Sequence, residues 1–184
     1  MSSKTNVQER VLANIVRAEI QDEEGGTTYV FTTSSEASVK PFVSEGAEKI
    51  HRVKNTILGA IRFEDILLGY DIKLVNNTFS PELLALIDGG EAEMDESGNF
   101  MAYSAPVVGE ATQRKSLTVN LYTEEVDCDG EMIDTIKFSF KHAKGKPVEY
   151  TFKDGEFFVP ELTLRSRAKS GESGVEITGM AYGA

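Results

Sequence analysis

Hydrophobic and polar residues alternate along most of this chain, which is the pattern of half-buried β-strands. In the segments 68–75, 117–121 and 136–140, apolar side chains occupy every second position and polar side chains lie between them. Turn-forming Asp, Asn and Gly residues separate many of these segments. Further strands are expected over residues 11–20, 27–33, 56–63, 91–94, 100–103, 148–152, 158–165 and 175–178.

One short helix interrupts the strands, over residues 80–88. Ser80 is suited to the N-cap position, and Pro81 to the first helical position, where its missing N–H costs nothing. The pair Gly89-Gly90 is suited to end the helix. A helix this short is not stable alone, so it is expected to dock on a sheet through its Leu and Ile side chains.

Residues 34–55 lack a sustained period and mix Ser, Pro and Gly with charged residues. A connection of about twenty residues is long for a compact domain. We interpret it as an extended inter-subunit loop, ordered against a neighbouring copy through Val39, Phe42, Val43 and Ile50. The alternative is a flexible surface loop.

Together these elements predict a mainly β fold, an antiparallel β-sandwich or barrel with one short helix packed on it and a long extended arm. The chain of 184 residues is long enough for one domain with a substantial core. We expect a single domain over residues 1–184, with residues 1–10 as a flexible N-terminal arm.

The net charge of the chain limits the kinds of molecule that it can bind. The formal net charge is −11, with 30 Asp and Glu against 19 Lys and Arg. Because nucleic-acid affinity comes largely from basic residues that neutralise phosphates, such a chain is not expected to grip DNA. The single cysteine, Cys128, cannot form an intrachain disulfide, and the N-terminal residues lack the apolar region of a signal peptide. No segment is apolar enough to span a membrane, so folding in a cytoplasm is expected.

The residues suggest no catalytic, cofactor or metal site. Neither His51 nor His142 has a second potential zinc ligand at the usual sequence spacing. The sequence also contains no nucleophile elbow and no phosphate-binding loop. His142 continues the apolar phase of residues 136–140, which predicts a partly buried strand residue. The acidic turns 95–99 and 127–131 resemble calcium loops, but the glycine that an EF-hand needs at its sixth position is missing, so hairpin turns are the simpler interpretation. We therefore expect no enzyme activity.

Several segments, in one order, resemble the tail tube (major tail) proteins of phages and prophages of Gram-positive bacteria. The similarity covers about residues 30–178 and rests on six stretches: SVKPFVSEG at 38–46 with RVKNT at 52–56, NTFSPELLALIDGG at 77–90, YSAPVVG at 103–109, LYTEE at 121–125, GEFFVPE at 155–161 and RSRAKSGE at 165–172. The chain departs from that family after its last strand, where an acidic segment is expected and residues 178–184 stand instead.

The resemblance implies a structural subunit that forms hexameric rings, which stack into a hollow tube in a virion tail assembled in the host cytoplasm. DNA would pass through the tube during ejection without specific binding. Tail sheath, tape measure and baseplate or terminator proteins are the implied partners. The candidate contact residues between subunits are Val39, Pro41, Phe42, Val43, Ile50, Arg52, Arg165 and Arg167.

Two alternatives stay open on these observations. The chain could form the inner tube of a contractile bacteriocin or injection system. It could also be a stand-alone β-sandwich binding module, in which case residues 34–55 should be mobile and sensitive to proteases.

Overall fold

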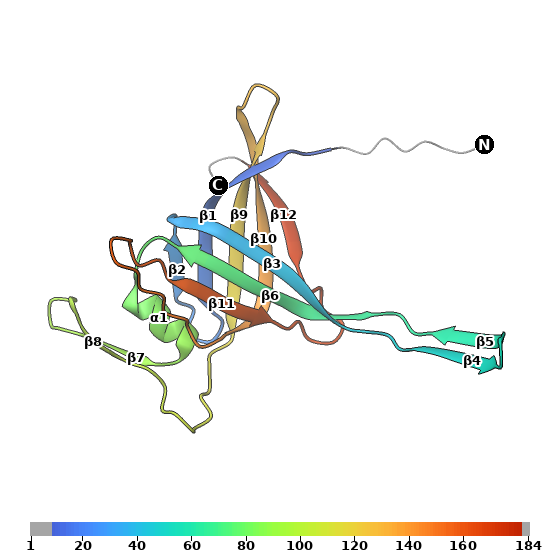
Figure 1. Ribbon diagram of the computed structural model, residues 1–184. Coiled ribbons are helices and arrows are strands. Elements are labelled where there is room, and N and C mark those ends of the chain that lie inside the picture. The colour runs from blue at the N-terminus through green and yellow to red at the C-terminus, as the bar shows by residue number, and fades with distance from the viewer. Residues whose placement is uncertain (1–8, 182–184) are drawn as a thin grey trace.

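The computed structural model describes residues 9–181, which form twelve strands and one helix (Figure 1). The elements in chain order are β1 (Leu12–Asp22), β2 (Thr28–Phe31), β3 (Ser34–Ser44), β4 (Glu48–Val53), β5 (Thr56–Arg62), β6 (Ile66–Asn76), α1 (Pro81–Asp88), β7 (Glu91–Met94), β8 (Phe100–Ser104), β9 (Leu117–Val126), β10 (Met132–Gly145), β11 (Glu161–Ser166) and β12 (Glu176–Ala181). The mainly antiparallel β fold with one short helix confirms the fold class predicted from the alternation.

Eight strands form one antiparallel sheet that folds into two layers. The order is β2-β1-β9-β10-β11-β6-β3, and β12 pairs with the first part of β10. Strand β10 belongs to both layers, because residues up to Phe140 and also Ala143 pair with β9, and Ala143–Gly145 pair with β11. In Figure 1, β3, β6 and β11 cross in front of β1, β9 and β10. The hairpins β4–β5 and β7–β8 are separate two-stranded sheets.

The core lies between the two layers and beneath α1. Alternate residues of the strands supply it, as the period of two requires. Helix α1 buries Leu83, Leu84 and Ile87 against the sheet, so the predicted docking of the helix is confirmed. The largest fully buried aliphatic side chains of the sheet are Ile20, Ile72, Leu74, Leu117, Val119 and Leu164.

Both helix ends follow the sequence signals. The Ser80 hydroxyl accepts a hydrogen bond from the Leu83 amide at 3.4 Å, and Pro81 begins the helix. Gly89 adopts a left-handed conformation with φ of 83°, which a residue with a side chain rarely adopts, and its amide donates to the Ala85 carbonyl.

Ser80→Ala is expected to lower the free energy of unfolding by about 1 kcal/mol, because one helix amide loses its acceptor. Urea denaturation measures this change. Ser80→Asp is the matched control and should retain near wild-type stability, since aspartate also caps helices. Equal losses in both variants would contradict a capping role.

Gly145 lets β10 approach the end of the helix. A Cβ atom at this position would lie 1.9 Å from the backbone carbonyl oxygen of Ile87, which is closer than any real contact. Gly145 is also buried in strand β10. The helix can therefore dock at this depth only if the position lacks a side chain.

Gly145→Ala is expected to destabilise the protein by about 2 kcal/mol, because the helix must move away from the sheet. Thermal or urea denaturation measures the loss. Gly59→Ala is the matched control, since a Cβ at Gly59 meets nothing within 4 Å. A tolerated Gly145→Ala would show that the helix is not held at this distance.

Residues 34–55 were expected to form an extended inter-subunit loop, but within the chain most of this segment is strand. Residues Ser34–Ser44 form β3 and pair with β6 along its length. Strand β3 is the last in the sheet order, so much of its surface faces solvent and its alternation is weak. Pro41 is tolerated there because an edge strand has unpaired backbone positions.

Three further differences concern burial and pairing. Residues 56–62 are the predicted strand, but every residue of β5 is exposed rather than half-buried. Residues 148–152 form no strand beyond a single bridge between Glu149 and Glu161. A bulge lies between Phe140 and Ala143, and His142 there has a φ of 53°. His142 therefore does not continue the alternation of apolar residues over 136–140 as the sequence predicted. Its side chain is nevertheless partly buried, as predicted.

The expected N-terminal arm of residues 1–10 lies almost entirely outside the described residues, which begin at Glu9. Residues 182–184, at the end that departs from the tail tube pattern, also lie outside them.

Candidate assembly surfaces

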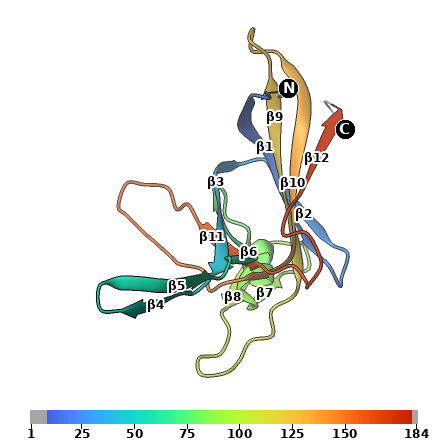
Figure 2. The same ribbon diagram turned by 90° about the vertical axis from the view of Figure 1, so that its right-hand side faces the viewer.

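A two-stranded arm projects from the body, formed by residues 46–65 with β4 and β5 (Figures 1 and 2). It continues the hairpin of β3 and β6 beyond the sheet. At its base the Gly46 amide donates to Asp65 Oδ1 at 2.8 Å, and the Phe63 amide donates to the Ala47 carbonyl at 3.2 Å. All residues of β4 and β5 are exposed. The arm therefore presents both of its faces to whatever lies beside the subunit.

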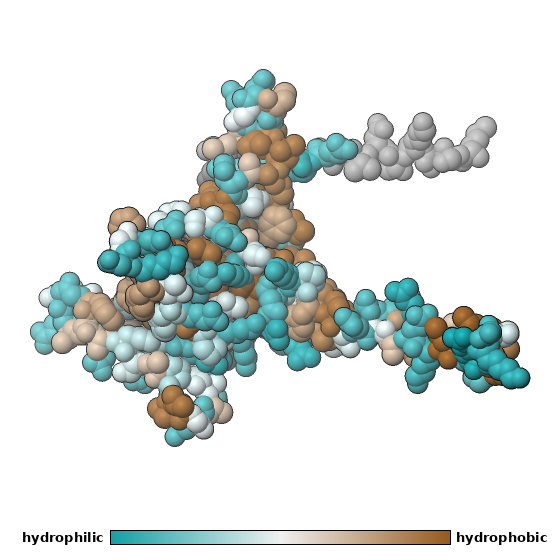
Figure 3. Space-filling model, in the orientation of Figure 1, coloured by the Kyte–Doolittle hydropathy of each residue, from teal (hydrophilic) through white to brown (hydrophobic). Residues whose placement is uncertain are grey.

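The arm is rich in exposed aliphatic and basic side chains. An isolated two-stranded hairpin is at best marginally stable in water, and large exposed apolar patches mark interaction surfaces. Figure 3 shows hydrophobic and hydrophilic residues mixed along this projection. Its exposed large apolar residues are Ile50, Val53, Ile57, Leu58, Ile61 and Phe63.

Two predicted contact residues lie in this arm. Ile50 is 53% exposed. Arg52 holds the tip of the arm, where its Nε donates to the Lys54 carbonyl at 2.6 Å and its Nη2 donates to Asn55 Oδ1 at 3.2 Å. Val43 is exposed near the base of the arm. All three are available to a neighbouring subunit.

Phe42 and Arg165 instead contact each other within the chain. The Arg165 guanidinium lies 4.5 Å from the centre of the Phe42 ring and donates two hydrogen bonds to Asp71, at 2.8 and 2.7 Å. The Arg165 hydrogen bond lowers the pKa of Asp71; burial opposes this effect, but a further hydrogen bond from Lys146 brings the pKa to about 2. This cluster joins β3, β6 and β11, so its first role is to hold the outer layer together.

The remaining predicted contact residues are divided between groove and surface. Val39 lines an apolar groove between the two layers with Phe138 and Ile177, and it also packs against the core. Pro41 and Arg167 are exposed. The structure therefore does not gather the eight predicted contact residues into one patch, although β3 and the arm carry six of them.

Glu23 accepts more hydrogen bonds than any other carboxylate among residues 9–181, and no sequence pattern pointed to it. It accepts hydrogen bonds from the Ser116 and Thr118 hydroxyls and from the His142 amide, and it lies 2.9 Å from His142 Nδ1. Burial raises the pKa of Glu23, but these donors outweigh burial and lower the pKa to about 2. A catalytic acid or base needs a pKa near the working pH. Glu23, like Asp71, is held ionised as a structural acceptor.

The acidic turns bind their own backbone. Asp95 Oδ1 accepts from the amides of Ser97 and Asn99, and Asp127 Oδ1 accepts from those of Asp129 and Glu131. This geometry confirms the hairpin-turn interpretation of both segments. Over residues 9–181, no group of three or more His, Cys, Asp or Glu residues is placed to hold a metal ion. Within the same range no helix is long and apolar enough to cross a membrane.

A cluster of aromatic rings on the helix side of the molecule was not predicted. Phe79 makes edge contacts with Phe100 and Phe158, whose centroids each lie 6.0 Å away. Phe158 also stacks with Phe152 at 5.0 Å and with Tyr150 at 6.4 Å. Because these rings come from three separate segments, only the fold brings them together. The available sequence signal was the four Phe and Tyr residues within positions 150–158, two of which, Tyr150 and Phe152, lie in the strand expected over residues 148–152.

Comparisons with known proteins give a likeness in structure but none in sequence. No protein-family model matches the sequence, and no curated protein matches it. Among solved structures, the chain is similar to a chain in the cryo-EM structure of the anti-feeding prophage (AFP) baseplate, 6-fold symmetrised. The TM-score is 0.44 and the sequence identity 11%, and the likeness covers 100% of both chains.

Proposed function

We propose that this protein is a structural subunit of a phage-type tail tube, in which hexameric rings stack into a hollow conduit for DNA during ejection. The observation that carries the proposal is the arm. It exposes large aliphatic side chains on a two-stranded hairpin that its own body does not cover. Such a hairpin needs a neighbouring molecule for a stable position, and the family resemblance of the sequence indicates a further copy of the same chain.

The sheet edges support assembly in the same way. Strands β2, β3 and β12 each pair along one side within the described residues. Edge strands offer unpaired N–H and C=O groups, which can pair with another chain. Head-to-tail contacts between identical copies close into rings when the rotation between copies allows it. Edges and arm together provide contacts in more than one direction, as stacked rings require.

The polar face of β1, β9, β10 and β12 suits the wall of a conduit. On this face Tyr122 donates to Glu19 Oε2 at 2.7 Å, and the Arg17 guanidinium lies 4.1 Å from the centre of the Tyr122 ring. Lys137 also approaches this ring, at 5.8 Å. Paired charges offer few free cations to DNA phosphates, and the net charge of −11 repels them.

The remaining parts of the proposal follow from its setting. The subunit would act in a virion tail assembled in the host bacterial cytoplasm, without chemistry of its own. Its partners would be further copies of itself, and tail sheath, tape measure and baseplate or terminator proteins at the outer wall, lumen and ends of the tube. The same design would serve the inner tube of a contractile bacteriocin or injection system.

Negative-stain electron microscopy of the purified protein over a concentration series tests the proposal. Hollow tubes with a regular axial repeat and six-fold end views are expected. Particles that stay monomeric at every concentration, with and without a preformed tail end as initiator, would overturn it.

The exposed aromatic stack favours a second candidate, a stand-alone β-sandwich binding module, because aromatic side chains are enriched at binding surfaces. Hydrogen exchange discriminates between the two functions. In a tube the amides of β4 and β5 should become strongly protected at assembling concentrations. In a module they should exchange rapidly at every concentration.

A further inference from the structure

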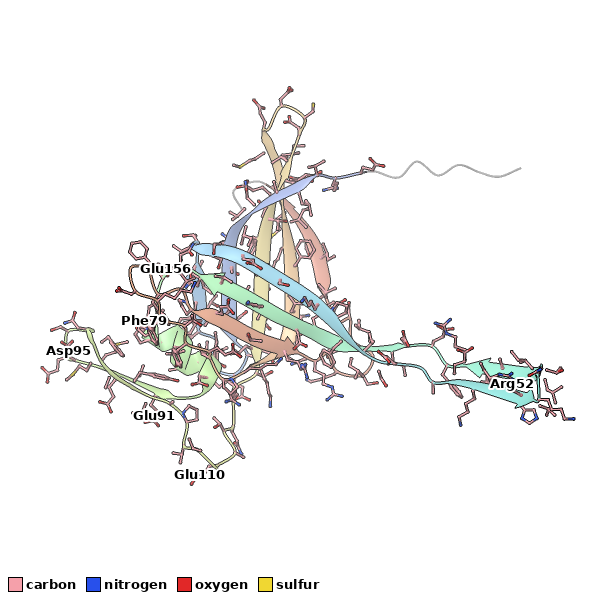
Figure 4. The ribbon with its side chains drawn as sticks, viewed as in Figure 1. Arg52, Phe79, Glu91, Asp95, Glu110 and Glu156 are labelled. Carbon is pink, nitrogen blue, oxygen red and sulfur yellow. The ribbon has the colours of Figure 1, made fainter. Side chains whose placement is uncertain are left out.

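Charged residues gather on the outer face of the layer formed by β3, β6 and β11. Figure 4 shows Arg52 of the arm at one end of the molecule and the carboxylates of Glu91, Asp95 and Glu110 at the other. Between these ends, β3, β6 and β11 cross in front of the other layer (Figure 1). Alternate side chains of these strands enter the core, so the side chains between them point outwards.

One row of charged residues crosses this outer face from strand to strand. Lys144 of β10 is paired in register with Arg165 of β11, Arg165 with Asp71 of β6, and Asp71 with Lys40 of β3. Residues that are paired across antiparallel strands lie on the same face of the sheet. The Nζ atom of Lys146 also lies 2.9 Å from Asp71 Oδ1. We call these five residues the basic row, since four are cations and one is a carboxylate.

The single carboxylate of the basic row does not balance its cations. Asp71 pairs with Arg165 at 2.7 Å and with Lys146 at 2.9 Å. Within the described part of the chain, no ion pair involves Lys40 or Lys144. Lys144 and Arg165 also lie directly opposite each other on neighbouring strands, where like charges repel. The row therefore keeps a positive charge in a chain whose net charge is −11.

Arg165 is held in one orientation and keeps free hydrogen-bond donors. Its guanidinium lies 4.5 Å from the centre of the Phe42 ring, and its Nε and Nη2 donate to Asp71. Two of the five N–H groups of a guanidinium are used in this way, and the others have no acceptor among the described residues. A planar donor that is already fixed loses little freedom when it binds a further carboxylate.

At its Lys144 end, the basic row opens into a polar hollow of about 550 Å³. Arg114 and Lys115 also line this hollow, and Glu24 is the one carboxylate among its described lining residues. Arg114 and Lys115 each have an acceptor within the subunit, whereas Lys144 has no ion-pair partner there. The row and the hollow together form a positive surface that is longer than the sheet is wide at this point.

We propose that the basic row is a docking site for an acidic segment of a different protein, whose carboxylates bind Arg165 and the two unpaired lysines. Three strand spacings separate Lys144 from Lys40, which is about 14 Å. An extended segment rises about 3.3 Å per residue and alternates its side chains, so acidic residues four positions apart span about 13 Å on one face. Such a segment reaches both lysines at once.

Other anionic partners fit the row less well. DNA carries one negative charge per about 1.7 Å of helix axis and gains affinity from many phosphate contacts, whereas the row offers four cations on a chain that is acidic overall. The acidic turns of a second copy are engaged already, because Asp95 and Asp127 accept hydrogen bonds from their own backbone amides. A carboxylate-rich segment of a different protein avoids both difficulties. The inference goes beyond the tube proposal and does not depend on it.

A fluorescein-labelled peptide of eight glutamates is the probe, and fluorescence anisotropy measures its binding to the purified subunit. At 0.1 M salt the Debye length is about 10 Å, so distant carboxylates of the chain are screened while the row still acts on the peptide. The row variant is Lys40→Gln with Lys144→Gln. It should bind the peptide about 10-fold more weakly than the wild type, because two exposed ion pairs are lost. Both lysines are exposed, so the melting temperature should not change.

The matched control is Lys49→Gln with Lys54→Gln, the same charge change on the exposed and equally basic arm. This control should keep the wild-type affinity for the peptide. Equal losses in the two variants, or a wild type that does not bind the peptide, would overturn the inference. A single-stranded DNA of eight nucleotides is the second probe. If it binds more tightly than the peptide and needs Lys40 and Lys144, the row is a nucleic-acid site and the inference is also overturned.

Sedimentation velocity of the row variant separates this inference from the proposed function. The variant should assemble as the wild type does, because the acidic segment belongs to another protein. Loss of assembly in the row variant but not in the arm control would place a second copy on the row and overturn the inference, with the tube proposal intact. A wild type that binds the peptide but never assembles would support the docking and overturn the tube.

Discussion

Replacement of residues 46–64 by an Asn-Gly turn is expected to abolish self-assembly and leave the folded body intact. The arm is a continuation of the β3–β6 hairpin, and Ser44 pairs with Ile66 at the point where it leaves the sheet. A two-residue Asn-Gly turn closes an antiparallel pair in the favoured geometry. The free energy of unfolding should change by less than about 0.5 kcal/mol, since the substitution removes no buried side chain.

Sedimentation velocity and electron microscopy measure the loss of assembly, and urea denaturation measures the free energy of unfolding of the body. A matched pair of variants separates side chains from the arm as a whole. Ile50→Ser with Ile57→Ser and Ile61→Ser should prevent assembly, because each loses exposed apolar surface worth roughly 1 kcal/mol or more when covered. Thr56→Ser with Ala60→Ser should assemble as the wild type does. Normal tubes from the truncated chain would contradict a role of the arm in assembly.

Glu23→Gln is expected to be the most destabilising single substitution of a carboxylate in the body, at about 3 kcal/mol near neutral pH. Glu23 receives donors from Ser116 and Thr118 at the start of β9 and from His142 in the β10 bulge, and its side chain is only 20% exposed. A glutamine would place an amide N–H₂ where one carboxylate oxygen now accepts hydrogen bonds. The buried donors would lose a partner, and the β1–β2 turn would lose its link to β10.

The loss should depend on pH in a defined direction. The pKa of Glu23 is lowered from an ordinary value of 4.5 to about 2 in the folded protein. Its contribution is therefore complete above pH 4.5 and disappears as the pH falls towards 2. The difference in unfolding free energy between wild type and Glu23→Gln should shrink across that window.

Urea denaturation from pH 2 to pH 7, at concentrations below assembly, measures this difference. Glu24→Gln is the matched control, because Glu24 is the exposed neighbour and should change stability by less than about 0.5 kcal/mol. A loss at Glu23 that is the same at pH 2 and pH 7 would indicate a change in packing rather than in charge.

Local structure could be predicted from the sequence wherever the controlling interactions are themselves local. The helix from Pro81 to Asp88 was predicted because Ser80, Pro81 and Gly89 act on backbone groups within one turn. The hairpin turn at Asp95 was predicted because its carboxylate binds amides two and four residues ahead. Alternation likewise identified the strands of the core, because a strand with one buried face must alternate.

The partner of each strand could not be predicted in the same way. Alternation shows which side chains of a strand share a face, but it does not show which other strand pairs with it. The sequence therefore predicts an extended loop over residues 34–55, although β6 holds residues 34–44 in a sheet. Glu23 shows the same limit, since its hydrogen bonds to His142 span 119 residues of sequence. The β10 bulge that places His142 there arises where this strand changes partners.

The sequence by itself thus determined the β character of the chain, its helix, its turns and its excess of negative charge, because these depend on residue type and short spacing. Only the tertiary structure decided that β5 alternates yet is exposed on both faces, and that basic and acidic segments lie at opposite ends. The physical reason is that burial and proximity are properties of the whole packing. A strand whose apolar face is covered only by another molecule has the same local pattern as a strand covered by the core of its own chain.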